Sequence, residues 1–267
     1  MIIKEMLSYY NLEKPPFTKE IKTADLQKLA TTEKAINSAR LLVETKGIGV
    51  MTGKSGTGKS CILRMLKNDL NPGLYKVMYL WHTSIGILEF YTHLCAELGL
   101  EPRLRRAVMF RMIHERILSL NKSHHIHPVL LIDEAHLLNN DILKEIRLLT
   151  NFEIDSVNAL TVLLCGQENL NMKFGLSTLE PLVNSITVNI HVESLKKEES
   201  FSYIEQRVAC AGSSTALFTK NAITFIHEAS GGIIRNINTI ANGSLFKAFY
   251  SKSSQVEAEH VKAVIQR

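Results

Sequence analysis

The sequence lacks the features that mark secreted or membrane proteins. Only four of its 267 residues are cysteines, and no two of them form a C-x-x-C pair, which argues against a disulfide framework. No apolar run approaches the ~18 residues of a membrane span. The start, MIIKEMLSYYNLEKPPF, has no apolar core followed by a small-residue cleavage site. We therefore expect a cytoplasmic protein with free thiols and no membrane association.

Internal repeats and low-complexity segments are also absent. The length suits one large α/β domain, or a core domain with a smaller satellite. The net charge of +5 and the sequence pI of about 8.9 are mild. They permit a nucleic-acid partner but do not by themselves indicate one.

The most informative stretch is IGVMTGKSGTGKS, residues 48–60. An apolar run suited to a buried strand is followed by a match to G-x-x-x-x-G-K-[ST], and residues 61–70 then have helical spacing. Glycines let backbone N–H groups approach phosphate oxygens, and the helix N-terminus favours an anion. A glycine-rich turn with an incidental lysine is the alternative. We expect the following residues to bind the nucleotide: Gly53, Lys54, Ser55, Gly56, Thr57, Gly58, Lys59, Ser60 and Cys61.

Within this loop, Lys59 is expected to reach the outer phosphates, and the Ser60 hydroxyl to hold Mg²⁺. A second acidic element, Asp133-Glu134, follows the apolar run 128–132. Asp133 is expected to hold Mg²⁺ through water, and Glu134 to polarise the water that attacks the γ-phosphate. The alternative is that the two acidic residues only mark the end of the strand and have no role in catalysis. No N-K-x-D guanine-reading motif is present, because Ser123 and His124 follow Asn121-Lys122, which favours ATP over GTP.

The remaining pattern predicts a parallel sheet between helices. Further strands are expected at 75–81, 160–165 and 187–192, and helices at 25–46, 85–98, 107–120 and 141–152. Residues 121–127, NKSHHIH, are expected to form a polar loop. We expect an α/β core over residues 1–195, with an N-terminal extension packed back onto it. From Lys196 only helices are expected, at 196–211, 219–229, 233–250 and 257–266, which predicts an all-helical domain over 196–267.

Together these motifs resemble those of an AAA+ ATPase, and more narrowly those of the ExeA-like and TniB/TnsC/MuB-like ATPases that accompany transposases. The similarity covers nearly the whole chain. The N-terminal Tyr9-Tyr10 with Pro16-Phe17 resembles the opening of that group. The segments that carry the resemblance, besides the phosphate loop, are LLIDEAHLL, LKEIRLLTNFEIDS, LLCGQENL and SGGIIRNIN. The resemblance implies a P-loop NTPase fold of the additional-strand type followed by a small helical lid.

The resemblance also implies roles for single residues. It puts Gln167 at the sensor 1 position, facing the γ-phosphate, and Arg235 at the sensor 2 position, where its guanidinium reports ATP. The alternatives are a strand-end cap and a solvated helix arginine. Ser185 stands where related ATPases commonly carry an arginine that completes the neighbouring subunit's site, and Arg147 is a candidate substitute.

A basic stretch between Glu101 and His125 is the predicted DNA contact. Its six cations outnumber two acids, as suits a backbone contact without base specificity. The four cations assigned to DNA are Arg103, Arg105, Arg106 and Lys122. A solvated helix face is the alternative. His124, His125 and His127 lack a cysteine or acid at ligand spacing, which argues against a metal site there.

The resemblance implies an ATP- and Mg²⁺-dependent homo-oligomer, a ring or helical filament, that assembles on duplex DNA. Its ATP state would recruit or activate a transposase, with or without a targeting protein, and hydrolysis would release it. An ExeA-like secretion ATPase is the main alternative. Those proteins carry a membrane span and a peptidoglycan-binding region, neither of which is found up to Arg267. A third possible function is that of an ATP-dependent loader of another DNA enzyme.

Overall fold

The structure, a computed structural model, describes residues 2–18, 29–213 and 215–266. The chain divides into two compact units. The sheet unit consists of residues 34–53 and 59–192. The helical unit lies within residues 1–33, 54–58 and 193–267, so the chain enters it briefly in the middle of the phosphate loop.

The sheet unit contains five strands in the order β2-β3-β4-β1-β5, and every neighbouring pair is parallel. The strands are β1 (Ile48–Thr52), β2 (Tyr75–Leu80), β3 (His127–Ile132), β4 (Thr161–Gly166) and β5 (Ile186–His191). Strands β1, β3 and β4 are buried along their whole length, which is why they read as continuous apolar runs. Strand β4 lies between β3 and β1, so the predicted additional-strand arrangement is confirmed.

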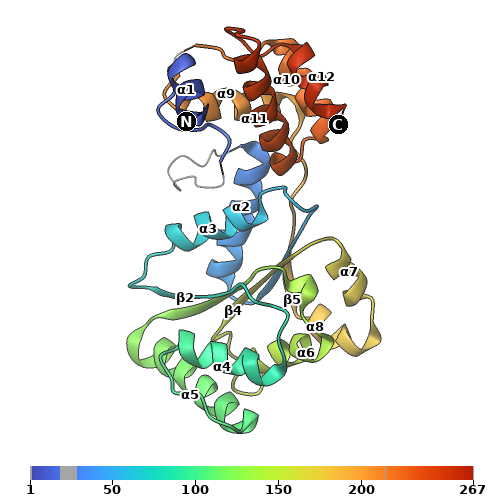
Figure 1. The fold of residues 1–267 in the computed structure, drawn as a ribbon. Helices are drawn as coiled ribbons and strands as arrows, with labels where there is room; N and C mark the ends of the chain where they lie inside the picture. The colour runs from blue at the N-terminus through green and yellow to red at the C-terminus, as the bar shows by residue number, and fades with distance from the viewer. Residues whose placement is uncertain (1, 19–28, 214, 267) are drawn as a thin grey trace. The chain divides into compact units, whose positions relative to one another are not determined.

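Helices cover both faces of this sheet (Figure 1). They are α2 (Ala30–Thr45), α3 (Lys59–Asp69), α4 (Ile87–Glu97), α5 (Arg106–His124), α6 (Asn140–Leu149), α7 (Asn169–Phe174) and α8 (Glu180–Val183). Of two short 3₁₀ turns, η2 (Ala135–Leu137) lies between β3 and α6, and η3 (Ser177–Leu179) lies between α7 and α8. Alternate strand residues such as Val50 and Leu164 pack with α4, α5 and α6 in one core. On α2, Leu42 approaches β1 so closely that a Cβ on Gly49 would lie 2.3 Å from its Cδ2.

The helical unit has its own apolar core. Its helices are α1 (Ile2–Tyr9), α9 (Lys197–Ala209), α10 (Lys220–Ser230), α11 (Ile234–Tyr250) and α12 (Ala258–Ile265). Met6, Tyr10 and Phe17 belong to this core, and the Tyr10 hydroxyl donates to Ser253 O at 3.0 Å. The N-terminal segment thus packs with the C-terminal helices, whereas we expected it on the α/β core. In the described parts of the chain, no helix is both long enough and apolar enough to cross a bilayer.

Two other local predictions differ from the structure. Residues 121–124 continue helix α5 instead of forming a loop. The reason is that the Asn121 amide donates to Ile117 O at 2.9 Å and to Ala159 O at 2.7 Å, while His125 ends the helix in a left-handed conformation. The predicted helix 25–46 is observed from Ala30; Asp25 and Leu26 lie outside the described residues.

Candidate nucleotide-binding site

Three predicted site elements follow three neighbouring strands. The phosphate loop follows β1, Asp133 and Glu134 follow β3, and Gln167 follows β4. These strands are adjacent in the order β3-β4-β1, and Thr52 is paired with Gly166. Because the strands are parallel, their carboxyl ends share one edge of the sheet, where open α/β sheets bind ligands.

Lys59 begins helix α3 with its side chain folded back onto the loop. The residue is 7% exposed, and its Nζ donates to Gly53 O at 2.9 Å. Further along the loop, Gly56 and Gly58 have φ angles of +85° and +100°, which only glycine adopts without strain. An ammonium held by a loop carbonyl at a helix N-terminus is placed to exchange that carbonyl for a phosphate oxygen.

The middle of the phosphate loop belongs to the helical unit, where it contacts the start of α11. Arg235 N donates to Gly56 O at 3.1 Å, and Arg235 Nη1 donates to Ser55 Oγ at 3.1 Å. A Cβ on Gly56 would lie 2.8 Å from the Cβ of Arg235, so no larger residue fits there. Within the loop, Thr57 Oγ1 donates to Lys54 O at 3.0 Å. The arginine predicted as sensor 2 therefore contacts two phosphate-loop residues through hydrogen bonds.

Asp133 is a buried carboxylate held in one orientation. Its Oδ1 accepts from Glu134 N at 2.9 Å, and its Oδ2 accepts from the Tyr79 hydroxyl at 3.1 Å. Burial and the neighbouring Asp133 charge raise the pKa of Tyr79, so this hydroxyl remains a donor. The oxygen donors of Asp133 and Ser60 suit Mg²⁺, a hard cation, and Ser60 is exposed. Tyr79 is not among the site residues predicted from the sequence, although a tyrosine in a strand beside an acidic strand end is a recognisable signal.

Glu134 lies in a left-handed turn (φ 50°) with its side chain 44% exposed. Its backbone O accepts from Thr83 Oγ1 at 3.2 Å. The buried His136 ring contacts two of the predicted residues: its Nδ1 lies 3.3 Å from Glu134 Oε2 and 3.4 Å from Gln167 N. Burial lowers the pKa of His136, although the Glu134 charge opposes this shift. In the sequence, His136 is noted only within the LLIDEAHLL segment, without a predicted role.

The residues considered for a trans contact have partners within the sheet unit. Ser185 lies between α8 and β5, where its Oγ donates to Pro181 O at 2.8 Å. The Arg147 guanidinium is paired with Asp155, with Nη2 2.7 Å from Oδ2. Cys61, which the sequence assigns to nucleotide binding, lies in the first turn of α3, with its Sγ 3.8 Å from Arg64 Nη2. If Arg147 completed the site of a neighbouring subunit, its ion pair with Asp155 would have to break.

Three of the four cations assigned to DNA are in ion pairs. Arg103 lies 3.4 Å from Glu101, Arg106 lies 3.0 Å from Glu145, and Lys122 pairs with Glu153. Arg105 is exposed at the N-cap of α5. Within the described parts of the chain, it is the member of this group without a side-chain hydrogen bond or ion pair. Arg105 is thus the cation of the group most available to a phosphate.

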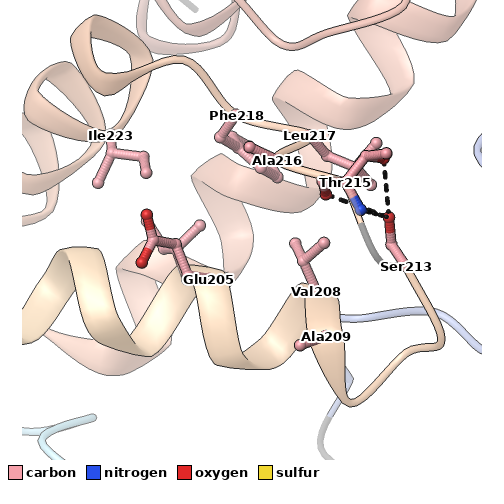
Figure 2. Close-up of a pocket in the computed structure, with 10 residues that line it drawn as sticks. Glu205, Val208, Ala209, Ser213, Thr215, Ala216, Leu217, Phe218 and Ile223 are labelled. Atoms are coloured by element: carbon pink, nitrogen blue, oxygen red, sulfur yellow. Dashed lines mark hydrogen bonds between the residues drawn. The ribbon is translucent and has the colours of Figure 1, made fainter.

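A cavity of about 220 Å³ lies in the helical unit, between α9, α10 and the residues that connect them (Figure 2). Apolar side chains such as Val208, Leu217 and Ile223 line most of it, and Glu205 supplies one carboxylate. It contains none of the residues assigned to ATP, and it is smaller than the ~300–1,000 Å³ of typical ligand sites. We assign it no role in nucleotide binding.

Comparison with known proteins agrees with this fold. General secretion pathway protein A of Aeromonas hydrophila is 31% identical over 212 residues, which are 79% of this chain and 38% of that protein. The chain therefore spans about two fifths of that relative's length.

Two solved structures have similar folds. Cdc6p from Pyrobaculum aerophilum has a TM-score of 0.72 at 16% identity, over 93% of this chain and 69% of that one. A chain of Drosophila ORC bound to DNA has a TM-score of 0.69 at 16% identity, over 98% of this chain and 65% of that one. The family model described as AAA domain matches residues 40–174, slightly more than half of the chain. This chain therefore belongs to the AAA domain family of P-loop ATPases.

Proposed function

We propose that this protein hydrolyses ATP with Mg²⁺ and that the bound nucleotide controls its assembly on duplex DNA. The observation that carries the ATPase part is the placement of Lys59, Asp133 and Gln167 after three adjacent parallel strands. Bound Mg²⁺ would neutralise charge on the phosphate oxygens. Lys59 binds the outer phosphates, and Glu134 accepts the proton of the attacking water, a reaction typical of this family.

In this proposal, Arg235 is the residue through which bound nucleotide affects the helical unit. Its guanidinium hydrogen-bonds Ser55, within the loop that surrounds the phosphates. A γ-phosphate offers this guanidinium a stronger, charge-assisted partner than the neutral serine hydroxyl. Binding of ATP would then change the contacts of the N-terminal end of α11 and, with them, those of the helical unit. This supports a nucleotide-dependent oligomer, a ring or helical filament.

The DNA-bound oligomer would recruit or activate a transposase, and hydrolysis would release it. The support is the resemblance of the five quoted segments to ATPases that accompany transposases, together with the unpaired Arg105 in the basic stretch. Contact with phosphates through Arg105 carries no base information, so the binding is not sequence-specific. We propose a cytoplasmic location.

A secretion-pathway ATPase is the second candidate. A specific observation favours it, namely the 31% identity to general secretion pathway protein A over 79% of this chain. That candidate requires ATP hydrolysis but no assembly on DNA. An ATP-dependent loader of another DNA enzyme would also bind DNA, but without a transposase partner.

Electron microscopy of the purified protein tests the proposal. The samples contain duplex DNA, a non-hydrolysable ATP analogue, both together, or DNA with ADP. We expect rings or filaments on DNA with the analogue and their loss with ADP. ATP hydrolysis without any DNA-dependent assembly would favour the secretion candidate. An adjacent gene for an integrase-type transposase would favour transposition over the loader.

A further inference from the structure

His136 lies between the two groups that act nearest the γ-phosphate in the proposed reaction. His136 is the central residue of η2, the turn that begins directly after Glu134, and it is 7% exposed. Strand β4 ends against it so closely that a Cβ on Gly166 would lie 3.1 Å from His136 N. The ring is therefore fixed beside both Glu134 and the start of the segment that follows β4.

A single ring nitrogen faces both neighbours. Nδ1 is 3.3 Å from the Glu134 carboxylate oxygen Oε2 and 3.4 Å from the Gln167 backbone N. Both distances exceed the ~2.9 Å of a typical N–H···O hydrogen bond. A neutral imidazole carries a proton on one nitrogen only. Nδ1 can therefore donate to Glu134 or accept from the Gln167 N–H, but it cannot do both.

We propose that His136 is a positioning residue for ATP hydrolysis and that its ring couples the backbone of Gln167 to the carboxylate of Glu134. When Nδ1 carries the proton, Glu134 is held on the ring. When the proton is on Nε2, Nδ1 holds the Gln167 N–H, and the carboxylate is free to accept a proton from water. The two states are tautomers of the neutral ring: Nδ1 gives its proton to solvent and Nε2 takes one from solvent, so the net charge is unchanged. The catalytic role of this coupling rests on the proposed ATPase function. The link between Glu134 and Gln167 through the ring does not depend on it.

Three substitutions separate the Nδ1 contact from ring packing. His136→Asn places an amide near the Nδ1 position, with an acceptor and a donor for the two neighbours. His136→Gln extends the amide towards the Nε2 position, and His136→Leu removes all polar atoms. We expect kcat for ATP to stay within about threefold in His136→Asn and to fall about tenfold or more in the other two, because general-base catalysis contributes ~10²–10⁴-fold. Affinity for the non-hydrolysable analogue should change by less than about threefold in all three.

A second readout requires no nucleotide. Long-range ¹H–¹⁵N spectra of the imidazole report the tautomer, and the Gln167 amide signal reports its hydrogen bond. Glu134→Gln replaces the carboxylate by a weaker acceptor, so we expect the His136 population to shift towards Nε2–H and the Gln167 amide to become more protected. His136→Leu should remove that protection, and His136→Asn should keep it.

Two results would overturn the proposal: equal kcat in His136→Asn and His136→Leu, or a tautomer and a Gln167 amide unaffected by Glu134→Gln. A wild-type protein that hydrolyses no ATP would instead overturn the proposed function. The spectra of the nucleotide-free protein would still decide whether Glu134 and Gln167 are coupled through the ring.

Discussion

Arg106 on α5 and Glu145 on α6 form an ion pair, with Nη1 3.0 Å from Oε1, and Tyr91 donates a hydrogen bond to the other oxygen of the same carboxylate. The Glu145 side chain is 9% exposed, and that of Arg106 is 54% exposed. Arg106 therefore neutralises a carboxylate inside the sheet unit. This is a structural role for a residue that its position in the sequence assigned to DNA.

Replacement of Arg106 by alanine should therefore destabilise the fold. It leaves a buried carboxylate without its cation, and we expect the free energy of unfolding to fall by about 1–3 kcal/mol, a range discounted for the exposure of Arg106. Urea denaturation measures this. Arg105→Ala, one residue away and fully outside the ion pair, is the matched control and should change stability by less than about 0.5 kcal/mol. Equal stability of both variants would contradict the structural role.

Arg105 should instead contribute to DNA binding. Each phosphate contact contributes about −0.9 to the slope of log affinity against log salt concentration. Arg105→Ala should flatten the slope by about one unit per protomer and weaken all duplex sequences alike. Fluorescence anisotropy over a salt series with saturating ATP analogue gives the slope. Arg111→Ala, an exposed cation on the same helix that lies 3.9 Å from Glu115, is the control. A slope unchanged by Arg105→Ala would show that Arg105 does not contact phosphates and would favour the alternative, in which the basic stretch is a solvated helix face.

The contact between Arg235 and Ser55 predicts a separation of assembly from folding. Arg235 is exposed, so Arg235→Ala should shift the unfolding temperature little. It should weaken ATP-driven assembly about tenfold or more, because a phosphate pair with arginine is stronger than a neutral hydrogen bond. Analytical ultracentrifugation with the ATP analogue measures assembly. Thr239→Ala, an exposed residue one turn further along α11, is the control and should assemble as the wild type does. Normal assembly with a large loss of thermal stability would show that Arg235 is structural.

Acid should destabilise the sheet unit through His127. Its ring is buried between Asn121 Oδ1, at 3.0 Å, and Thr161 Oγ1, at 2.8 Å, and burial lowers its pKa to about 4. Between pH 6.5 and 4 the unfolded chain binds this proton and the folded chain does not. Stability therefore falls as the pH falls through this window, by at most about 3 kcal/mol, and His127 causes no further loss below it.

Urea denaturation of the nucleotide-free protein at several pH values tests this expectation. His127→Gln keeps a polar side chain but does not titrate, so its stability should depend less on pH than that of the wild type. Burial also lowers the pKa of His114, and this contribution is common to both proteins. Parallel pH profiles of the two proteins would exclude His127 as the source.

Much of the fold was predictable because local patterns specify it. The strands at residues 48–52 and 127–132 are buried on both faces and appear as unbroken apolar runs. The phosphate loop was predictable because its chemistry requires fixed spacings. The N-terminal segment was misplaced because Tyr10 has its partner, Ser253, at the opposite end of the chain, and no local pattern encodes such a contact.

The same limit applies to the candidate site. A count of charges in the basic stretch could not reveal that Arg106 faces Glu145, 39 residues further along the chain. The link through His136 could not be predicted either, since it depends on how closely β4 ends against η2. Spacing identifies the residues of a motif, but it does not identify the neighbours that orient them.

The central claim, that ATP turnover at Glu134 controls assembly on DNA, is tested most directly by the lifetime of the DNA complex. Anisotropy of a labelled duplex is followed after a limited amount of ATP and Mg²⁺ is added, together with phosphate release. The wild type should bind DNA and then release it as ATP is consumed, and Lys59→Ala should not bind. Glu134→Gln should bind and stay bound, with phosphate release slowed about 10²-fold or more. Release of DNA and phosphate by Glu134→Gln at the wild-type rates would contradict the claim.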